Sequence, residues 1–226
     1  GGVVHARAVV LATGGYGGNA EMFARLTGGR RLVTAAMPGS TGAGIAMAAE
    51  AGAEIVGQDK FLPTYAGVEA APGEGRVVWR QMPSLTPQVR LPWELHLDPA
   101  GRRFVREDDP SVDAREHALD ALPGLSFWCV FDEAVAAAAP PLLPGWTEAE
   151  LRAAWAERPD FVAAGSVAEL AAATGMDRPA LEQSLAAYAA ACGGTAPDPM
   201  GRQYCPQAIG RAPLQAIRMH GMVLKT

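Results

Sequence analysis

A nearly uninterrupted apolar run, followed at once by a pair of glycines, constrains the fold more than any other feature of this chain. Residues 3–12 read VVHARAVVLA, alternating at first and then continuously apolar, and Thr13-Gly14-Gly15 comes directly after them. A run of this kind ended by turn residues is typical of a strand buried on both faces of an α/β sheet. Because open α/β sheets bind ligands at the carboxyl ends of their strands, we expect binding chemistry at this turn.

The composition is that of a folded globular protein and not of a disordered chain. The 226 residues are 49% hydrophobic and 19% charged, which is typical of a globular protein. The net charge of −5 offers no basic field, so we expect neither nucleic acid nor an anionic membrane surface as a partner. No apolar run approaches the roughly 18 to 20 residues of a membrane span. The chain begins at Gly1 without Met or a signal-peptide pattern, and we expect it to be cut at the front.

The cysteines indicate a reducing compartment. Cys129, Cys192 and Cys205 are odd in number and widely scattered, with no CxxC spacing. Such a set is typical of reduced thiols rather than of a disulfide framework or a zinc site. Three histidines, His5, His96 and His117, also lack partners at metal-ligand spacing. We predict no metal site on this ground. We therefore expect a cytoplasmic location and no bound metal.

The periodicity divides the chain near residues 58–62. Helices are predicted before that point near 19–27 and 41–52, the second beginning at Ser40 or Thr41. After it, residues 94–98 and 103–106 predict a hairpin and residues 126–131 a buried strand. Further helices are predicted near 112–121, 131–138, 147–157, 166–174 and 178–192, the last two capped by Ser166 and Asp177. Residues from 193 to about 213 are predicted to be loop.

Five segments together resemble one flavoprotein family. They are ARAVVLATGGYGGN (6–19), PGSTGAGIAMAAEAGA (38–53), AGRRFVRED (100–108), FWCVFDE (127–133) and SVAELAAATGMDRPALEQSLAAY (166–188). In this order they are similar to the fumarate reductase and succinate dehydrogenase flavoprotein family, which includes 3-ketosteroid dehydrogenases. The resemblance covers nearly the whole chain, although no GxGxxG motif occurs in it.

The resemblance implies a fold and a cofactor. The fold would be α/β plus α+β, with residues 1–60 forming part of a discontinuous FAD-binding sheet domain. Residues 61–226 would form an α+β capping domain over the substrate, ending where the FAD domain would resume. We therefore expect the chain to be the middle portion of a larger flavoenzyme with FAD as its cofactor. Residues 8–12 should then expose apolar surface, because the rest of their sheet lies elsewhere.

Two glycine segments are the predicted cofactor contacts. Glycine at a strand end lets the backbone approach a cofactor closely, although an ordinary tight turn would use the same residues. In the second segment Ala43 stands where the family has an acidic residue, which removes one polar contact, and a plain helix N-cap is the alternative there. The predicted contacts are Ala12, Thr13, Gly14, Gly15, Thr41, Gly42 and Gly44.

Two charged residues match the family's proton relay in part. Arg90 lies 14 residues before Phe104, the spacing at which fumarate reductases keep a relay arginine. The relay glutamate expected three residues earlier is replaced by Pro87. Glu107 follows the GRRFVRE pattern and would pair with Arg90 or with Arg103, the alternative being a solvated hairpin charge. For Arg90 the alternative is an exposed loop arginine.

Other substrate-side positions depart from the family. The proton-donating arginine expected four residues after the glutamate is Ser111, unless Arg115 takes its place one helical turn later. A substrate-binding histidine is replaced by Leu62, and the run 223–226 (VLKT) lacks another, so a dicarboxylate has lost its ligands. His220 is a candidate substitute, although a lone histidine is more often structural.

These departures favour a bulky apolar substrate. Five aromatic residues could line the pocket for such a substrate: Tyr65, Trp79, Trp93, Phe127 and Trp128. For Phe127 and Trp128, packing in the core is the stronger expectation. The leading hypothesis is an FAD-dependent oxidoreductase that exchanges a hydride between flavin N5 and an activated carbon–carbon bond. Two alternatives are a non-catalytic module, mainly the capping domain, that binds no cofactor by itself, and a helical interaction domain.

Overall fold

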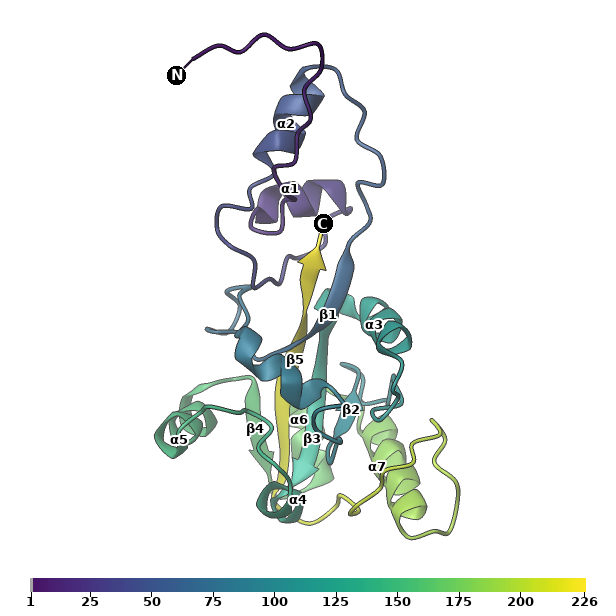
Figure 1. The fold of residues 1–226 in the computed structure, drawn as a ribbon. Coiled ribbons are helices and arrows are strands. Elements are labelled where there is room, and N and C mark those ends of the chain that lie inside the picture. Colours follow the sequence, from purple (N-terminus) through teal and green to yellow (C-terminus); the bar gives the residue numbers. More distant parts are fainter. Residues whose placement is uncertain (1) are drawn as a thin grey trace.

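The computed structural model describes residues 2–226, and its centre is an antiparallel sheet of five strands (Figure 1). The strands are β1 (Leu62–Gly67), β2 (Leu95–Leu97), β3 (Ser126–Asp132), β4 (Phe161–Ala164) and β5 (Leu214–Lys225). The order is β1-β5-β3-β2, with β4 also paired to β5. Because β3 takes one side of β5, strands β1 and β4 share the other side, at opposite ends of the long strand.

Local sequence explains which strands were predictable. All seven residues of β3 are buried, as its apolar run predicted. In contrast, β1 contains Pro63 and the 12-residue β5 contains Arg218, His220 and Gly221, so neither presents a plain strand pattern. The predicted strand over 103–106 does not form. Only Arg103 makes a single antiparallel bridge, to Leu97, and its side chain is buried in an ion pair with Glu107.

The helices lie where the sequence predicted them. They are α1 (Ala20–Leu26), α2 (Ala43–Glu50), α3 (Val112–Asp120), α4 (Glu133–Ala138), α5 (Glu148–Glu157), α6 (Val167–Thr174) and α7 (Arg178–Cys192). Ser166 and Asp177 cap α6 and α7 through their side-chain oxygens, as expected. Two short 3-10 helices, Trp79–Leu85 and Pro123–Leu125, connect the strands. The cap of α2 is Gly42, not Ser40 or Thr41.

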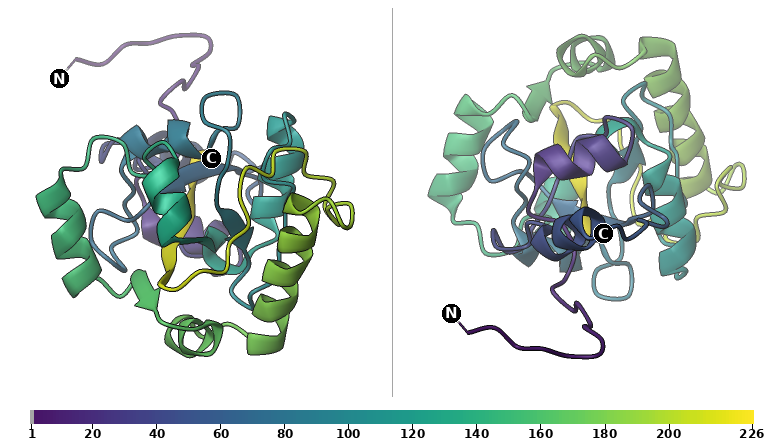
Figure 2. Two further views of the ribbon diagram at one scale, coloured as in Figure 1. Left: turned by 90° about the horizontal axis from the view of Figure 1, so that it is seen from below. Right: turned by 90° about the horizontal axis from the view of Figure 1, so that it is seen from above.

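Helices pack around the sheet and enclose one main core. Figure 2 shows the sheet between α5 on one flank and α7 on the other. Phe127 and Leu97 are fully buried at its centre, and Leu181 of α7 and Leu170 of α6 close the core. Burying such side chains contributes about 1.5 to 3 kcal/mol each, so this core holds the sheet and its helices together.

The first 60 residues contribute no strand to the sheet, but they pack against one end of it. In Figure 1, α1 and α2 sit beyond the end of β5 where the chain terminates. Side chains and backbone both link these residues to the sheet. Phe23 belongs to the main core, Val33 packs with Ala66 and Met222, and the amide of Val223 donates to the carbonyl of Val33 at 2.8 Å. Strand β1 begins at Leu62, and the domain boundary near 58–62 stays a prediction.

The predicted strand over residues 3–12 is wrong for this chain. Within residues 2–226 no strand pairs with it, and the segment is extended coil. Val9 and Val10 are 79% and 89% exposed, so residues 8–12 present apolar surface as expected. The physical reason is that a strand requires a neighbour to satisfy its backbone N–H and C=O groups, and apolar propensity alone does not supply one.

Candidate functional site

Three segments far apart in sequence converge beyond the end of β5. The amide of Tyr16 donates a hydrogen bond of 2.9 Å to Thr226 Oγ1. A Cβ atom at Gly15 would lie 2.2 Å from the same hydroxyl, and one at Gly44 would lie 1.8 Å from Thr13 Oγ1. Only glycine fits at both positions, because real Cβ atoms do not approach other heavy atoms below about 3 Å. The structure thus brings the two predicted cofactor segments together and adds Thr226, which the sequence analysis had not singled out as a contact.

This convergence leaves backbone donors uncommitted. Gly42 has a left-handed φ of 76° and provides no side-chain cap for α2, whose first amides therefore lack the usual partner. Asn19 Nδ2 donates to the carbonyl of Thr41 at 2.9 Å and holds this turn in place. Gly14 has a φ of 80°, and a Cβ atom there would meet only open space. An exposed left-handed glycine and an uncapped helix start are the donors that a phosphate-bearing dinucleotide prefers, so these residues fit part of an FAD site.

Arg90 is a buried member of an ion pair, not an exposed loop arginine. Its Nη1 donates to Glu94 Oε1 and Oε2 at 3.0 Å each, and its Nε donates to the carbonyl of Pro140 at 3.0 Å. Burial acts to raise the pKa of Glu94. His96, whose Nε2 lies 3.5 Å from Glu94 Oε1, and the positive charge of Arg90 act in the opposite direction. Together they outweigh burial and lower that pKa to about 2. Arg90 therefore pairs with Glu94, which the sequence analysis missed.

Glu107 is also fully buried, which contradicts the alternative of a solvated hairpin charge. Of its two predicted partners it pairs with Arg103, which donates from Nε at 2.9 Å and from Nη2 at 2.5 Å. Arg202 Nη1 lies 3.4 Å from the same carboxylate. Arg103 also pairs with Asp198, so two arginines and two carboxylates form one buried group.

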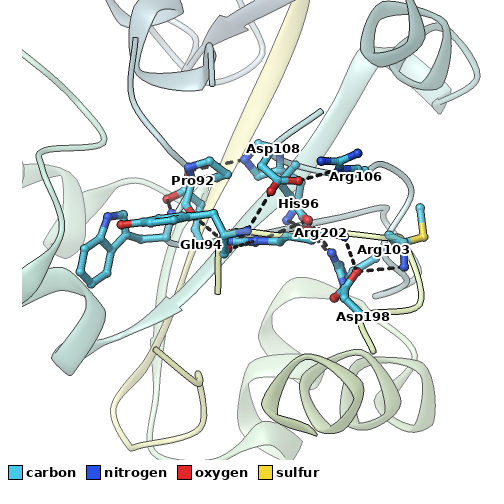
Figure 3. Close-up of polar contacts among 12 residues, drawn as sticks. Pro92, Glu94, His96, Arg103, Arg106, Asp108, Asp198 and Arg202 are labelled. Carbon is cyan, nitrogen blue, oxygen red and sulfur yellow. Dashed lines mark hydrogen bonds and ion pairs between the residues drawn. The ribbon is translucent and has the colours of Figure 1, made fainter. Parts of the chain in front are cut away.

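This buried group fastens the loop of residues 193–213 to the sheet (Figure 3). Arg202 Nη1 donates to the carbonyl of Glu94 at 2.8 Å, and its Nη2 donates to that of Pro92. Asp108 accepts from the amides of Gln203 and Tyr204 at 2.7 and 2.9 Å and from Arg106 Nε at 2.8 Å. The sequence signal that could have revealed this network is the presence of Asp198 and Arg202 inside a Gly- and Pro-rich loop.

Ser111 and Arg115 have different roles in α3. Ser111 is the N-cap, its Oγ accepting from the amide of Ala114 at 3.2 Å. Arg115 is 3% exposed and donates from Nη2 to the carbonyl of Leu85 at 2.6 Å. Its guanidinium carbon lies 4.3 Å from the ring centre of Tyr65. Its Nε has no partner, and it forms no ion pair with any residue from 2 to 226. Burial lowers the pKa of this guanidinium.

His220 lies in the middle of β5 and is buried. Its Nδ1 has no hydrogen-bond partner among the described residues. Burial lowers its pKa to about 4; the charges of Arg218 and Arg31 add to this, and those of Glu69 and Asp160 oppose it. At neutral pH the ring is therefore uncharged.

The aromatic residues do not gather in one place. Phe127 and Trp128 are buried in the core, as expected. Tyr65, predicted to lie in a loop, is a buried residue of β1 that packs on Phe127 at 5.4 Å between ring centres. Trp93 packs on Tyr204, and Trp79 is half exposed. Leu62 pairs in register with Lys225 at the end of the sheet nearest α1 and α2.

One side-chain group has metal-ligand chemistry that spacing along the sequence did not predict. Atoms of Glu94, His96 and Cys129 lie within 4.8 Å of one another, all buried. The Glu94 carboxylate already accepts from Arg90, and burial raises the pKa of Cys129, which disfavours the thiolate that a metal requires. The expectation of no metal site stays a prediction.

The class of protein is established by comparison with known sequences. A model of the FAD binding domain family matches residues 3–226, so the chain belongs to that family, whose cofactor is FAD. The chain is 27% identical over 221 residues to the probable fumarate reductase Ifc3 of Shewanella frigidimarina. That match covers 96% of this chain and 34% of the relative, so the chain spans about a third of that protein's length.

Solved structures show the same fold. The open conformation of a flavocytochrome c3 fumarate reductase superposes with a TM-score of 0.61 at 23% identity, over 96% of this chain and 35% of that one. A 3-ketosteroid delta1-dehydrogenase from Sterolibacterium denitrificans superposes with a TM-score of 0.66 at 22% identity, over 97% and 42%. Among residues 2–226, no helix is long and apolar enough to cross a membrane.

Proposed function

We propose that this chain is part of an FAD-dependent oxidoreductase that exchanges a hydride between the flavin and an activated carbon–carbon bond of an organic substrate. The observation that carries the proposal is the convergence of Thr13, Gly44 and Thr226, in a chain whose family binds FAD. In such enzymes the flavin accepts or supplies the electrons, and the protein positions the substrate and provides charge and protons.

The donors proposed to face the cofactor are backbone amides at Gly14 and at the start of α2. Gly42 and Gly44 are buried against Met22 and Thr13, which holds the turn rigid. A rigid turn keeps its amides pointing one way, and preorganised donors bind anions without an entropic cost of ordering. The residues of this chain would form only part of the site, because it lacks the Gly-rich strand-to-helix turn that holds a pyrophosphate.

The test is the flavin content of glycine variants. Gly44→Ala forces a methyl group into Thr13 and should displace the turn, whereas Gly39→Ala adds a methyl group in open space and serves as the matched control. We expect the purified full-length Gly44→Ala protein to retain less FAD, measured by absorbance and by the flavin dissociation constant. Far-UV circular dichroism checks that it remains folded. Unchanged FAD affinity in a folded Gly44→Ala protein would argue against the cofactor assignment.

On the substrate side we propose that Arg115 provides positive charge. It is a buried guanidinium without a carboxylate partner in residues 2–226, held against the Tyr65 ring by the cation–π contact. A buried unpaired cation is costly, so such a group is well placed to stabilise negative charge that develops on a substrate. Arg90, fixed by Glu94, stays a candidate for the proton relay.

The substrate class follows from what the site lacks. Leu62 has no polar atom with which to bind a carboxylate, and we propose a bulky apolar substrate rather than a dicarboxylate. The full-length enzyme should therefore reduce fumarate poorly, which steady-state assays with fumarate and with an apolar enone compare directly. Rapid fumarate turnover would contradict the substrate class without contradicting the flavin site.

The alternative is a non-catalytic module that binds no cofactor by itself. The missing pyrophosphate motif favours it for the isolated 226 residues. An absorption spectrum of this polypeptide after incubation with FAD and gel filtration distinguishes the two possibilities, because retained flavin absorbance requires a site within these residues.

A further inference from the structure

A polar cavity of about 280 Å³ lies on one face of the sheet, apart from the convergent glycine segments. Trp128 of β3 faces Arg218 of β5 in register, and His220 lies two residues further along β5, so all three side chains project from the same face. Arg31, Glu69 and Asp160 complete the polar part of the lining. The cavity is therefore bordered by the sheet, by the loop that follows β1 and by the end of α6.

The two carboxylates of this cavity are already neutralised. Glu69 accepts from Arg31 Nη2 at 2.5 Å and from the amides of Gly73 and Gly75 at 2.5 and 3.2 Å. Asp160 accepts from Arg158, from Nε at 2.9 Å and from Nη2 at 2.6 Å. Carboxylates with this many donors neither attract a cation nor strongly repel a second anion.

Two further side chains of the cavity, Arg218 and His220, have no charged partner. Arg218 is an exposed residue of β5 that donates from Nη2 to Ser126 Oγ at 3.0 Å and forms no ion pair with the rest of the described chain. His220 is 5% exposed, and its Nδ1 has no hydrogen-bond partner anywhere in residues 2–226. A buried ring with an unmet hydrogen bond is costly, so a ligand that completes the hydrogen bonds of the His220 ring is favoured there.

We propose that this cavity binds a small oxyanion, a carboxylate or a phosphate, between the Arg218 guanidinium and the ring of His220. The planar guanidinium can donate two parallel hydrogen bonds to such an anion, and a neutral imidazole adds one further N–H donor. The volume is at the lower end of small-molecule sites, which limits the ligand to a compact one. The site is independent of the flavin-facing turn and requires no flavin chemistry.

Calorimetric titration of the purified full-length protein tests the proposal at pH 7 and constant ionic strength. Inorganic phosphate and benzoate are titrated separately, and we expect saturable binding of at least one of them at a single site. Binding of phosphate alone, or of benzoate alone, identifies which oxyanion the cavity accepts. Arg218→Gln should weaken that binding by roughly tenfold or more, the effect of losing one charge-assisted contact. Arg152→Gln, on the exposed side of α5, is the matched control and should leave the affinity unchanged.

A second variant and a second readout separate the site from general charge effects. His220→Phe keeps an aromatic ring but removes both nitrogens, and it should weaken the same titration while Arg218 is intact. In the unchanged protein, the ring nitrogen shifts of His220 in ¹⁵N-labelled samples should move with the bound fraction. The proposal is overturned if neither anion saturates the protein, or if Arg218→Gln binds as tightly as the unchanged protein.

Discussion

The amide of Tyr16 donates a 2.9 Å hydrogen bond to the Thr226 hydroxyl, although 210 residues separate them in sequence. This contact joins the first turn of the chain to the end of the longest strand. It places Gly15 so close to Thr226 that no side chain would fit between them. The geometry of the turn at Gly14 and Gly15 therefore depends on how β5 ends.

Replacing Thr226 by Val keeps the shape of the side chain but removes the hydroxyl. We expect a loss of about 1 kcal/mol in the free energy of unfolding, because one partly buried amide loses its acceptor. Amide hydrogen exchange should accelerate at Tyr16 and its neighbours and should not change in the core strand β3. Equal exchange rates in the two proteins would show that the contact does not hold the turn.

Breaking the buried ion-pair group should be far more damaging. Arg202→Met removes the cation that bridges Glu107 and the backbone of residues 92 and 94, leaving a buried carboxylate with less compensation. We expect a loss of about 3 to 5 kcal/mol in the free energy of unfolding, measured with urea. Arg102→Met is the matched control, since its pair with Asp98 is solvent-exposed on the arginine side and should contribute about 1 kcal/mol or less. Similar losses in both variants would contradict a special role for the buried group.

Stability should decrease as the pH falls from neutral towards the pKa of His220. That pKa is about 4 in the folded state, below the ordinary value of 6.5, so between these values the unfolded chain binds the proton and the folded chain does not. Stability is fully present above pH 6.5 and is lost as the pH falls. Urea unfolding at pH 7 and pH 5 should differ by about 2 kcal/mol on account of this residue. His220→Gln should remove that part of the difference, and an unchanged pH dependence in the variant would refute the assignment.

Substitution at Arg115 should separate catalysis from binding of the flavin. We expect Arg115→Gln to lower turnover of the full-length enzyme by roughly 10²- to 10⁴-fold, the range for a lost catalytic charge or proton donor. Flavin content should stay normal. Arg115→Lys retains the charge and should recover part of the rate, with a shifted pH profile. If turnover in Arg115→Gln is near normal, the proposal that Arg115 provides the substrate-side charge is wrong.

The helices and two strands, β2 within the predicted 94–98 and β3, could be predicted because their signals are local. Ser166 and Asp177 mark helix starts through bonds to amides three residues away, and the apolar run of β3 marks a buried strand. Strand β1 was missed because Pro63 interrupts its pattern, and residues 3–12 were wrongly predicted as a strand because a strand is defined by its neighbour. Local pattern reports which face a residue prefers, whereas pairing is a non-local property.

The amino-acid sequence by itself indicated the family and its cofactor through the resemblance of five ordered segments. It also determined the positions of the helices, because caps and periodicity act over a few residues. Only the tertiary structure decided which charges pair. Arg90 pairs with Glu94, and Glu107 pairs with Arg103. Arg202, from a loop about 100 residues further along the chain, lies against the carboxylate of Glu107 as well. Buried charges choose partners by position in three dimensions, and the desolvation that makes an unpaired charge costly arises only once the chain has folded around it.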